Sequence, residues 1–219
     1  MPGETQFLPG GTIRLHRHDL PDDISFGPVV AVDTEAMGLN PHRDRLCLVQ
    51  LSAGDGTAHL VQIVPEHLGG HGPQGARNLA RLIADPGVVK LMHFARFDVA
   101  LLQHALGVTC APVRCTKIAA KLVRTFTERH GLRDLCRELL GVEISKQQQT
   151  SDWGVAELSP EQIAYAASDV LHLHALWQRL EGLLVREQRL DLAQACFDFL
   201  PARARLDLLG YEEPDIFAH

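Results

Sequence analysis

The amino-acid sequence predicts an α/β fold, in which a mixed central sheet is flanked by helices and the C-terminal half is mainly helical. Short apolar, β-branched runs separated by turn residues dominate the first part of the chain. Beyond residue 115, helix formers with apolar positions at a 3.6-residue period prevail. Strands followed by helices favour one sheet wrapped by helices, and 219 residues with 46% hydrophobic side chains suffice for one substantial core.

The expected strands occupy the first part of the chain. Residues 1–10 indicate a loose arm, and a strand follows at TIRLHRH, with Ile13 and Leu15 on one face. Three further runs are predicted to be adjacent strands of one sheet: PVVAVDT, RLCLVQLS and AHLVQI, the last two separated by the turn residues GDGT. The patch HLGGHGPQG at residues 67–75 is expected to be a loop.

Helices and strands alternate in the middle of the chain. GARNLARLIAD has helical spacing and is stopped by Pro86 and Gly87, before the expected strand VVKLMHF. A second helix is expected at ARFDVALLQHAL, until Gly107 and Pro112 break the pattern.

The remainder of the chain is predicted to be helical. The segments are KIAAKLVRT, GLRDLCRELLG and the long stretch from Ser159 to about Leu200. Ser159 can cap the last of these, because Pro160 suits a first turn and Gln162 has capping-box spacing. We therefore expect an N-terminal arm at residues 1–12, one domain at 13–200 and a C-terminal tail at 201–219 that contributes to oligomer contacts.

Composition restricts the partners and the compartment. The 21 Lys and Arg against 27 Asp and Glu give a formal charge of −6, which opposes tight binding of long nucleic acids unless the attraction is local. Apolar runs are too short to cross a bilayer, and the N-terminal residues lack the apolar core of a secretion signal. Five scattered cysteines suit reduced thiols. These features predict a cytoplasmic protein without a membrane partner.

Five polar residues form the candidate site. Asp33 and Glu35 end an apolar strand, and its two-residue period aims both carboxylates to one face. Asp98 follows a later strand near a helix start, and Tyr165 and Asp169 lie one turn apart on the capped helix. Each has an ordinary interpretation: a solvated strand end, a favourable charge at a helix N-terminus, or a packed ring beside a surface carboxylate. Their combination and order indicate a shared site.

In this order the motifs VAVDTEAMGL, HFARFD and YAASD resemble the DEDDy subgroup of the DEDD exonucleases, which includes ribonuclease D. SKQQQTSDW is similar to the ribonuclease D segment that precedes the last motif, and the resemblance covers about residues 13–180. It implies a ribonuclease H-like fold and 3′-5′ exonuclease activity for residues 13–200. With HRDRLCLVQLS, CTKIAAKLVRT and ERHGLRDLC, the chain looks most similar to the alphaproteobacterial nanoRNase C group. That implies short oligoribonucleotides, including dinucleotides, as substrates and a ring-shaped homo-octamer.

The resemblance also implies roles for individual residues. Asp33, Glu35, Asp98 and Asp169 would ligate metal, while Tyr165 would orient the attacking water. Oxygen ligands without a Cys/His cluster suit Mg²⁺ or Mn²⁺, with two ions about 4 Å apart in each active site. The candidate substrate-binding residues are Thr34, Met37, Gly38, Leu39, His93, Phe94, Lys146 and Gln149.

Several alternatives remain open at this stage. Leu39 is either a wedge against the terminal base or a core residue, and the segment from Lys146 to Gln149 either contacts a phosphate or is an exposed loop. Phe94 stands where many family members have Asn, which affects the contacts expected near His93. A DNA-directed exonuclease of the same fold and a noncatalytic nucleic-acid-binding protein are the competing functions.

Overall fold

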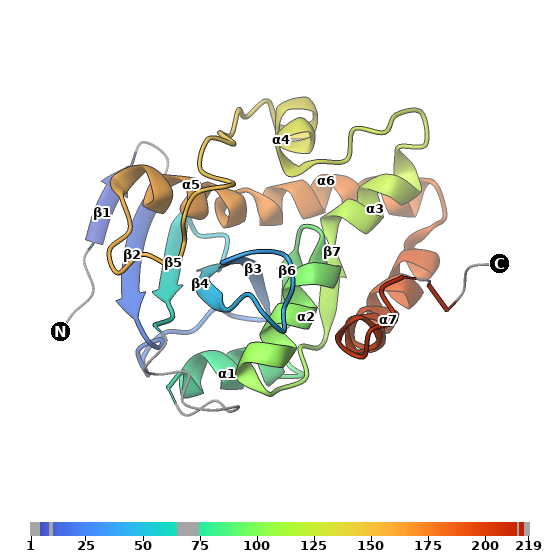
Figure 1. The fold of residues 1–219 in the computed structure, drawn as a ribbon. Helices are drawn as coiled ribbons and strands as arrows, with labels where there is room; N and C mark the ends of the chain where they lie inside the picture. Colours follow the sequence, from blue (N-terminus) through green and yellow to red (C-terminus); the bar gives the residue numbers. More distant parts are fainter. Residues whose placement is uncertain (1–4, 9–10, 65–74, 214, 217–219) are drawn as a thin grey trace.

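A seven-stranded mixed sheet forms the centre of the computed structural model, which describes residues 5–8, 11–64, 75–213 and 215–216 (Figure 1). The strand order is β1-β2-β5-β4-β3-β6-β7. β1 pairs antiparallel to β2, and β4 lies antiparallel to both β3 and β5; the other neighbours are parallel. The strands are β1 (Thr5–Leu8), β2 (Gly11–Arg17), β3 (Val29–Ala36), β4 (Leu46–Ser52), β5 (Thr57–Gln62), β6 (Val89–Met92) and β7 (Val113–Cys115). The predicted adjacency of the three central strands β3, β4 and β5 is confirmed.

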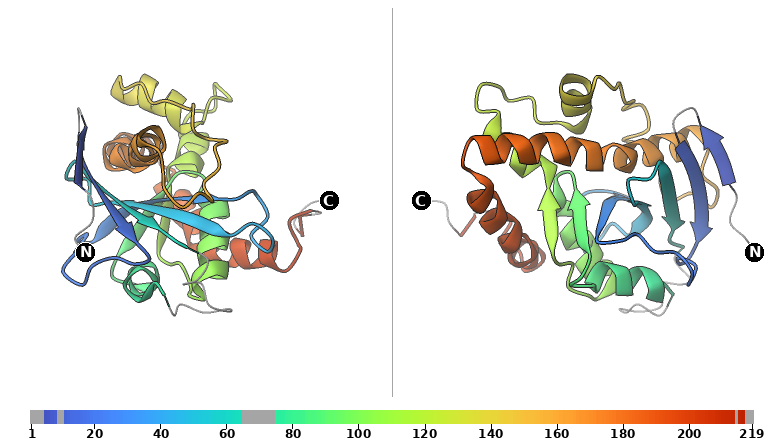
Figure 2. Two further views of the ribbon diagram at one scale, coloured as in Figure 1. Left: turned by 60° about the vertical axis from the view of Figure 1, so that its left-hand side comes forward. Right: turned by 180° about the vertical axis from the view of Figure 1, so that it is seen from behind.

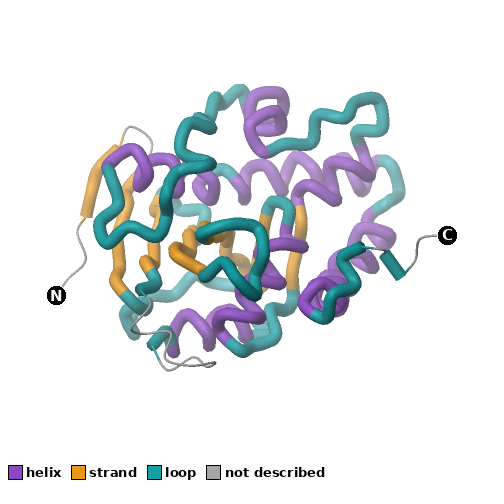
Figure 3. Tube along the Cα trace, viewed as in Figure 1, coloured by secondary structure: helices purple, strands orange, loops and turns teal. Residues whose placement is uncertain are grey.

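Helices cover both faces of the sheet (Figure 2). Helices α5 and α6 run along one face, and α1 and α2 lie on the other (Figures 1 and 2). Helix is concentrated in the second half of the chain, as predicted. The tube in Figure 3 shows these helices around the strands of the sheet. The helices are α1 (Arg77–Ala84), α2 (Ala95–Leu106), α3 (Thr116–Val123), α4 (Leu132–Leu135), which continues into a π-helix at Cys136–Leu140, α5 (Pro160–Leu171), α6 (Leu173–Arg186) and α7 (Leu190–Leu208).

Strand β4 lies at the centre of the core. All seven of its residues are buried, because β3 and β5 flank it and helices cover both of its faces. A strand buried on both faces is expected to be apolar along its whole length. Gln50 and the last residue, Ser52, are therefore exceptions among Leu, Val and Cys.

Two short strands differ from the sequence prediction. Residues 5–8 of the expected arm form β1, which pairs with β2 through the main chain, an interaction that the side-chain pattern does not reveal. The three residues of β7 also escaped prediction, because a run this short carries no period; they pair parallel to β6. The predicted loop at residues 67–75 lies almost wholly outside the described residues.

The C-terminal helix extends beyond the expected boundary at residue 200. Helix α7 continues through Pro201 to Leu208. Its last turns are held by Asp207, which accepts two hydrogen bonds from Arg96 of α2 at 2.7 and 2.8 Å and forms an ion pair with Arg203 at 2.9 Å. These tertiary contacts offset the helix-breaking tendency of proline. The stretch from Ser159 is also divided, with α5 ending before His172 and α6 ending at Arg186.

Two predictions from composition can be compared with this fold. All five cysteines are free thiols, as expected. Among the described residues, the helices are too short or too polar to cross a membrane.

Candidate active site

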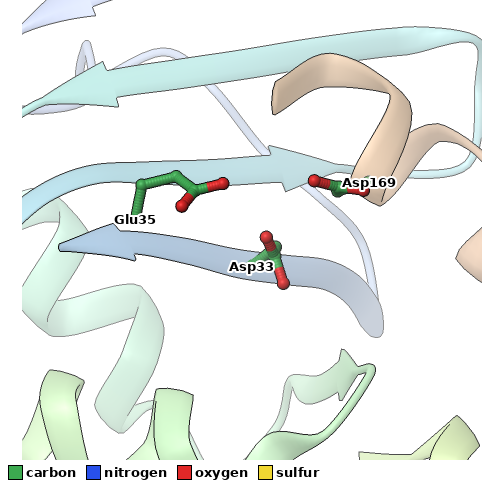
Figure 4. Close-up of side chains that lie close together, drawn as sticks. All are labelled: Asp33, Glu35 and Asp169. Carbon is green, nitrogen blue, oxygen red and sulfur yellow. The ribbon is translucent and has the colours of Figure 1, made fainter. Parts of the chain in front are cut away.

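Strand β3 supplies two carboxylates to one side of the sheet. Asp33 and Glu35 are two residues apart, so the strand period directs both toward the face covered by α5. One carboxylate oxygen from each of Asp33, Glu35 and Asp169 lies within 4.8 Å of the other two. Figure 4 shows the three side chains, two from β3 and one from α5, turned toward a common space. The predicted convergence of these residues is present.

Helix α5 places Tyr165 and Asp169 over the sheet. Its start is defined by the predicted capping box: the Ser159 hydroxyl accepts from the Gln162 amide, and the Gln162 side chain accepts from the Ser159 amide. With the helix register fixed, positions 165 and 169 project one turn apart. Tyr165 donates a hydrogen bond to the Asp169 carboxylate, and its ring lies 6.0 Å from that of buried Trp153.

Asp98 joins the site from the N-terminal turn of α2. It is outside the group of three carboxylates within 4.8 Å, but it lines the same pocket. The Thr34 hydroxyl donates a 2.6 Å hydrogen bond to Asp98 Oδ1, and both side chains are buried. Thr34 lies between Asp33 and Glu35 in sequence, so this single strand position ties Asp98 to the carboxylate pair.

Burial raises the pKa of all four carboxylates, and repulsion between them adds to this at Asp33, Glu35 and Asp169. Withdrawal from solvent raises the pKa of Asp33 well above its usual range, and Asp98, Asp169 and Glu35 raise it further. Burial, reinforced by Asp169 and Asp98, raises the pKa of Glu35 to about 9. Burial also raises the pKa of Asp98 to about 7 and that of Asp169 to about 7, against the hydrogen bonds from Thr34 and Tyr165. Four buried acids that line one pocket require compensating positive charge if they are to be ionised together.

The cluster fits a divalent cation on the chemistry of its donors. Every ligand atom in the group is a carboxylate oxygen, the hard donor that Mg²⁺ and Mn²⁺ prefer. Among the described residues, Asp33, Glu35 and Asp169 are the three acids, histidines or cysteines close enough to hold one ion together. Bound positive charge would also relieve the repulsion that raises their pKa values.

A pocket of about 320 Å³ contains these groups. This volume is at the lower end of the range for small-molecule sites, roughly 300–1,000 Å³. Five of the eight predicted substrate-binding residues line the pocket together with the five site residues: Thr34, His93, Phe94, Lys146 and Gln149. The segment from Lys146 to Gln149 thus borders the pocket, although Gln147 and Gln148 line a neighbouring cavity.

The three residues after the first motif lie elsewhere. Met37, Gly38 and Leu39 are not among the residues that line the pocket. Leu39 is 84% exposed, so the interpretation of it as a core residue is wrong. Gly38 is close to Asp44, whose carboxylate oxygen would be only 2.3 Å from a Cβ at that position. Contact of these residues with a substrate stays a prediction.

His93 and Phe94 form one wall of the pocket. His93 Nδ1 lies 2.9 Å from the Thr116 hydroxyl, and burial, with nearby Lys117 and Lys146, lowers the pKa of His93 to about 3. Phe94 is 51% exposed and adopts a left-handed conformation, with φ of 64°. Lys117 Nζ lies 3.9 Å from the centre of the Phe94 ring, a cation–π contact.

The polar residues at the site that sequence reasoning missed include Lys117, Arg133 and Gln50. Lys117 and Arg133 line the pocket and, with Lys146, surround it with positive charge in a chain of net charge −6. Gln50 donates from its side-chain amide to Asp33 Oδ2 at 3.4 Å. A signal for Gln50 was present, because an amide between apolar neighbours in a buried strand is unusual.

Fold and site together define a class of enzyme. Acidic residues from a central strand and from two helices, with a tyrosine beside them and basic side chains in the pocket lining, form a group of oxygen donors that could hold a metal ion. Such sites are used for metal-assisted displacement at phosphate esters.

Known proteins identify the family. The 3′-5′ exonuclease family matches residues 18–184, and the chain belongs to this family. It is 36% identical to ribonuclease D of Gluconacetobacter diazotrophicus over 187 residues, which are 85% of this chain and 43% of that protein. The chain thus spans less than half the length of this curated relative.

Solved structures show the same relationship over nearly the whole chain. NrnC of Brucella melitensis bound to pGG is 55% identical, with a TM-score of 0.88 over 94% of this chain and 98% of that one. The same protein with bound Mg²⁺ is 54% identical, with a TM-score of 0.87 and equal coverage. The resemblance to ribonuclease D and to the nanoRNase C group is therefore confirmed, as is the predicted fold.

Proposed function

We propose that the protein is a metal-dependent 3′-5′ exoribonuclease that hydrolyses short oligoribonucleotides, including dinucleotides, to nucleoside 5′-monophosphates. The observation that carries this proposal is the meeting of Asp33, Glu35 and Asp169 within 4.8 Å, beside Asp98 and Tyr165, in one pocket. Membership of the 3′-5′ exonuclease family supports the type of reaction.

Asp33, Glu35, Asp98 and Asp169 would hold the metal. When bound, two Mg²⁺ or Mn²⁺ ions would supply positive charge for both the attacking and the departing oxygen of an in-line displacement. Two ions are favoured over one because the site has four carboxylates with raised pKa values. Thr34 would keep Asp98 oriented through its hydroxyl.

Tyr165 would orient the attacking water rather than deprotonate it. Burial and the adjacent carboxylates, Asp169 first, raise the pKa of Tyr165 above its ordinary value near 10, so its phenolate is scarce at neutral pH. The Tyr165 hydroxyl donates a hydrogen bond to Asp169 and keeps its proton. The hydroxyl oxygen is therefore available to accept a hydrogen bond from water. Glu35 would also contact the terminal 3′ hydroxyl.

The charge distribution supports a short substrate. The overall charge of −6 opposes a long polyanion, whereas Lys117, Arg133 and Lys146 offer positive charge locally. Phe94 offers an exposed aromatic face beside them, and Thr34, His93 and Gln149 offer polar groups. The description of the Brucella melitensis protein as bound to pGG also supports a short oligonucleotide. Met37, Gly38 and Leu39 would contact substrate only from beyond the pocket lining.

Assembly and location complete the proposal. A homo-octameric ring is proposed by resemblance, with the C-terminal tail at 201–219 contributing to subunit contacts. Exposed apolar side chains such as Phe126 and Leu209 are available for such contacts. A cytoplasmic location is supported by the five free thiols, which suit a reducing compartment.

A substrate-length series would test the activity. RNA of two or more nucleotides, matched DNA and a duplex would be incubated with Mg²⁺, with Mn²⁺ and with a chelator, and the products separated. Release of nucleoside 5′-monophosphates, fastest from the shortest RNA and abolished by the chelator, is expected. Faster hydrolysis of DNA would instead favour the DNA-directed exonuclease, and no hydrolysis under any condition would favour a noncatalytic protein.

A further inference from the structure

Gln50 is a polar residue at a buried position of β4 that an apolar side chain could fill, which indicates a role other than packing. It lies at the middle of β4, it is fully buried, and its neighbours Val49 and Leu51 are fully buried and apolar. Its Oε1 atom, like that of the buried Gln62 in β5, has no hydrogen-bond partner among the described residues, so the role of Gln50 must be judged from its amide nitrogen. A leucine or methionine would fill such a position without leaving an unsatisfied polar atom.

The nitrogen of the Gln50 side-chain amide contacts the carboxylate group of Asp33. In the antiparallel pairing of β3 and β4, Gln50 is directly opposite Asp33, so the two side chains share the face that α5 covers. The Gln50 Nε2 atom donates to Asp33 Oδ2 at 3.4 Å. The contact therefore follows from the register of the sheet, not from a flexible surface side chain.

A second buried glutamine shows what an ordinary structural role looks like in this sheet. Gln62 of β5 pairs with Leu48, two residues before Gln50, and thus lies on the same face. Its Nε2 donates to the main-chain carbonyls of Val155 and Ala156, at 3.0 and 3.3 Å. Gln62 ties a connecting segment to the sheet. Within the part of the chain that the structure describes, the Gln50 side chain makes no such tie, and the hydrogen bond that it does make goes to a carboxylate of the site.

We propose that Gln50 is a positioning residue of the metal site: its amide holds Asp33 Oδ2 and so fixes which carboxylate oxygen faces the cation. This inference rests on the proposed function, because it requires Asp33 to be a metal ligand. Groups that orient a ligand from behind contribute to metal affinity although they do not touch the ion. An amide donor suits this position, since it can bind a carboxylate oxygen without competing for the cation.

Matched substitutions separate positioning from folding. Gln50→Met removes the donor and keeps an unbranched side chain of similar length, and Gln62→Met makes the same change on the neighbouring strand. Mn²⁺ binding would be measured by titration calorimetry or by the electron paramagnetic resonance of free Mn²⁺. Thermal unfolding would be followed in chelator, where no metal contributes to stability.

Opposite patterns are expected from the two variants. Gln50→Met should weaken Mn²⁺ binding about 10- to 100-fold, with an unfolding temperature in chelator equal to or above that of the parent. Gln62→Met should lower the unfolding temperature and leave Mn²⁺ affinity unchanged. Unchanged Mn²⁺ affinity in Gln50→Met, or equal losses of affinity in both variants, would overturn the inference.

Hydrolysis by the parent protein is measured separately. A parent that binds Mn²⁺ in a Gln50-dependent manner but does not cleave RNA dinucleotides would reject the proposed activity and retain the positioning role. A parent that binds no Mn²⁺ would overturn both.

Discussion

Two clusters of charged side chains in this molecule differ in how their charges are balanced. At the α2–α7 contact, Asp207 lies between Arg96 and Arg203, and each arginine is within 2.9 Å of a carboxylate oxygen. At the opposite extreme, Asp33, Glu35, Asp98 and Asp169 gather with raised pKa values. The first cluster is complete within the chain and holds a helix in place. In the second, the pKa values stay raised although lysines and an arginine line the pocket, a pattern that is frequent at functional sites.

The largest effect is expected from removing one acid of the unbalanced cluster. Asp33→Asn keeps the shape of the side chain but removes a metal-binding charge, so hydrolysis should fall by about 10³-fold or more. Stability in chelator should not fall, because one of four repelling charges is gone. Steady-state hydrolysis of an RNA dinucleotide and thermal unfolding in chelator check both parts. Activity close to that of the parent would contradict the assignment.

The balanced cluster should respond in the reverse manner. Asp207→Asn removes the carboxylate that both arginines share and leaves Arg203 buried, which should lower the free energy of unfolding by about 3 kcal/mol. Chemical denaturation measures this loss. Hydrolysis per folded molecule at low temperature should match that of the parent, since the pocket lining does not include Asp207. A stability equal to that of the parent would show that the ion pairs contribute little.

A smaller effect is expected from Tyr165→Phe. Loss of one hydroxyl that orients water should reduce turnover about 10- to 100-fold, as for a hydrogen bond to a charged or reacting group. The affinity for Mn²⁺ should stay nearly unchanged because the four carboxylates remain. Turnover at saturating substrate and a Mn²⁺ titration of the same preparation test the assignment. Weaker metal binding with normal turnover at saturating metal would assign Tyr165 to the ligand shell instead.

The smallest expected effect is a pH dependence of stability from two stacked histidines on the neighbouring strands β2 and β5. His16 of β2 and His59 of β5 lie with Nε2 and Nδ1 3.1 Å apart. Burial, then the charges of His16 and Arg14, lower the pKa of His59 to about 4. Between that value and the ordinary one near 6.5, the unfolded chain binds the proton and the folded chain does not, so stability falls as pH falls.

His59→Gln should flatten this part of the profile. The unfolding temperature of the parent and the variant would be compared from pH 7 downward to about pH 4, the window of the lowered pKa. The difference between the two curves isolates the histidine from the carboxylates, which titrate in both proteins. Parallel curves would show that His59 takes up a proton as readily in the folded state as in the unfolded one.

The two pairs of site residues, Asp33 with Glu35 and Tyr165 with Asp169, could be predicted from the sequence because each pair depends on local geometry. The strand period places Asp33 and Glu35 together, and the capping box at Ser159 sets the register that carries Tyr165 and Asp169. The order of these motifs and their resemblance to known exonucleases supplied the rest, including the fold. Their roles in catalysis stay predictions until the substitutions are made.

The groups that were missed depend on contacts between distant segments. Gln50 reaches Asp33 only through the register of β3 on β4, and Lys117 and Arg133 meet at the pocket from α3 and α4. The periodicity of apolar residues predicts helices and strands, but it does not predict which distant side chains come into contact. The same reason explains why the end of α7 was misplaced: its last turns depend on Arg96, about a hundred residues earlier.

The left-handed backbone at Phe94 limits how the protein can be stabilised by design. A bulky side chain in that conformation costs on the order of 1 kcal/mol, and glycine or asparagine would relieve the strain. Screens that select only for heat resistance would therefore favour replacing Phe94. Such variants would lose the aromatic ring that Lys117 contacts at the wall of the pocket. Thermostable variants should be sought elsewhere in the chain, with this position held constant.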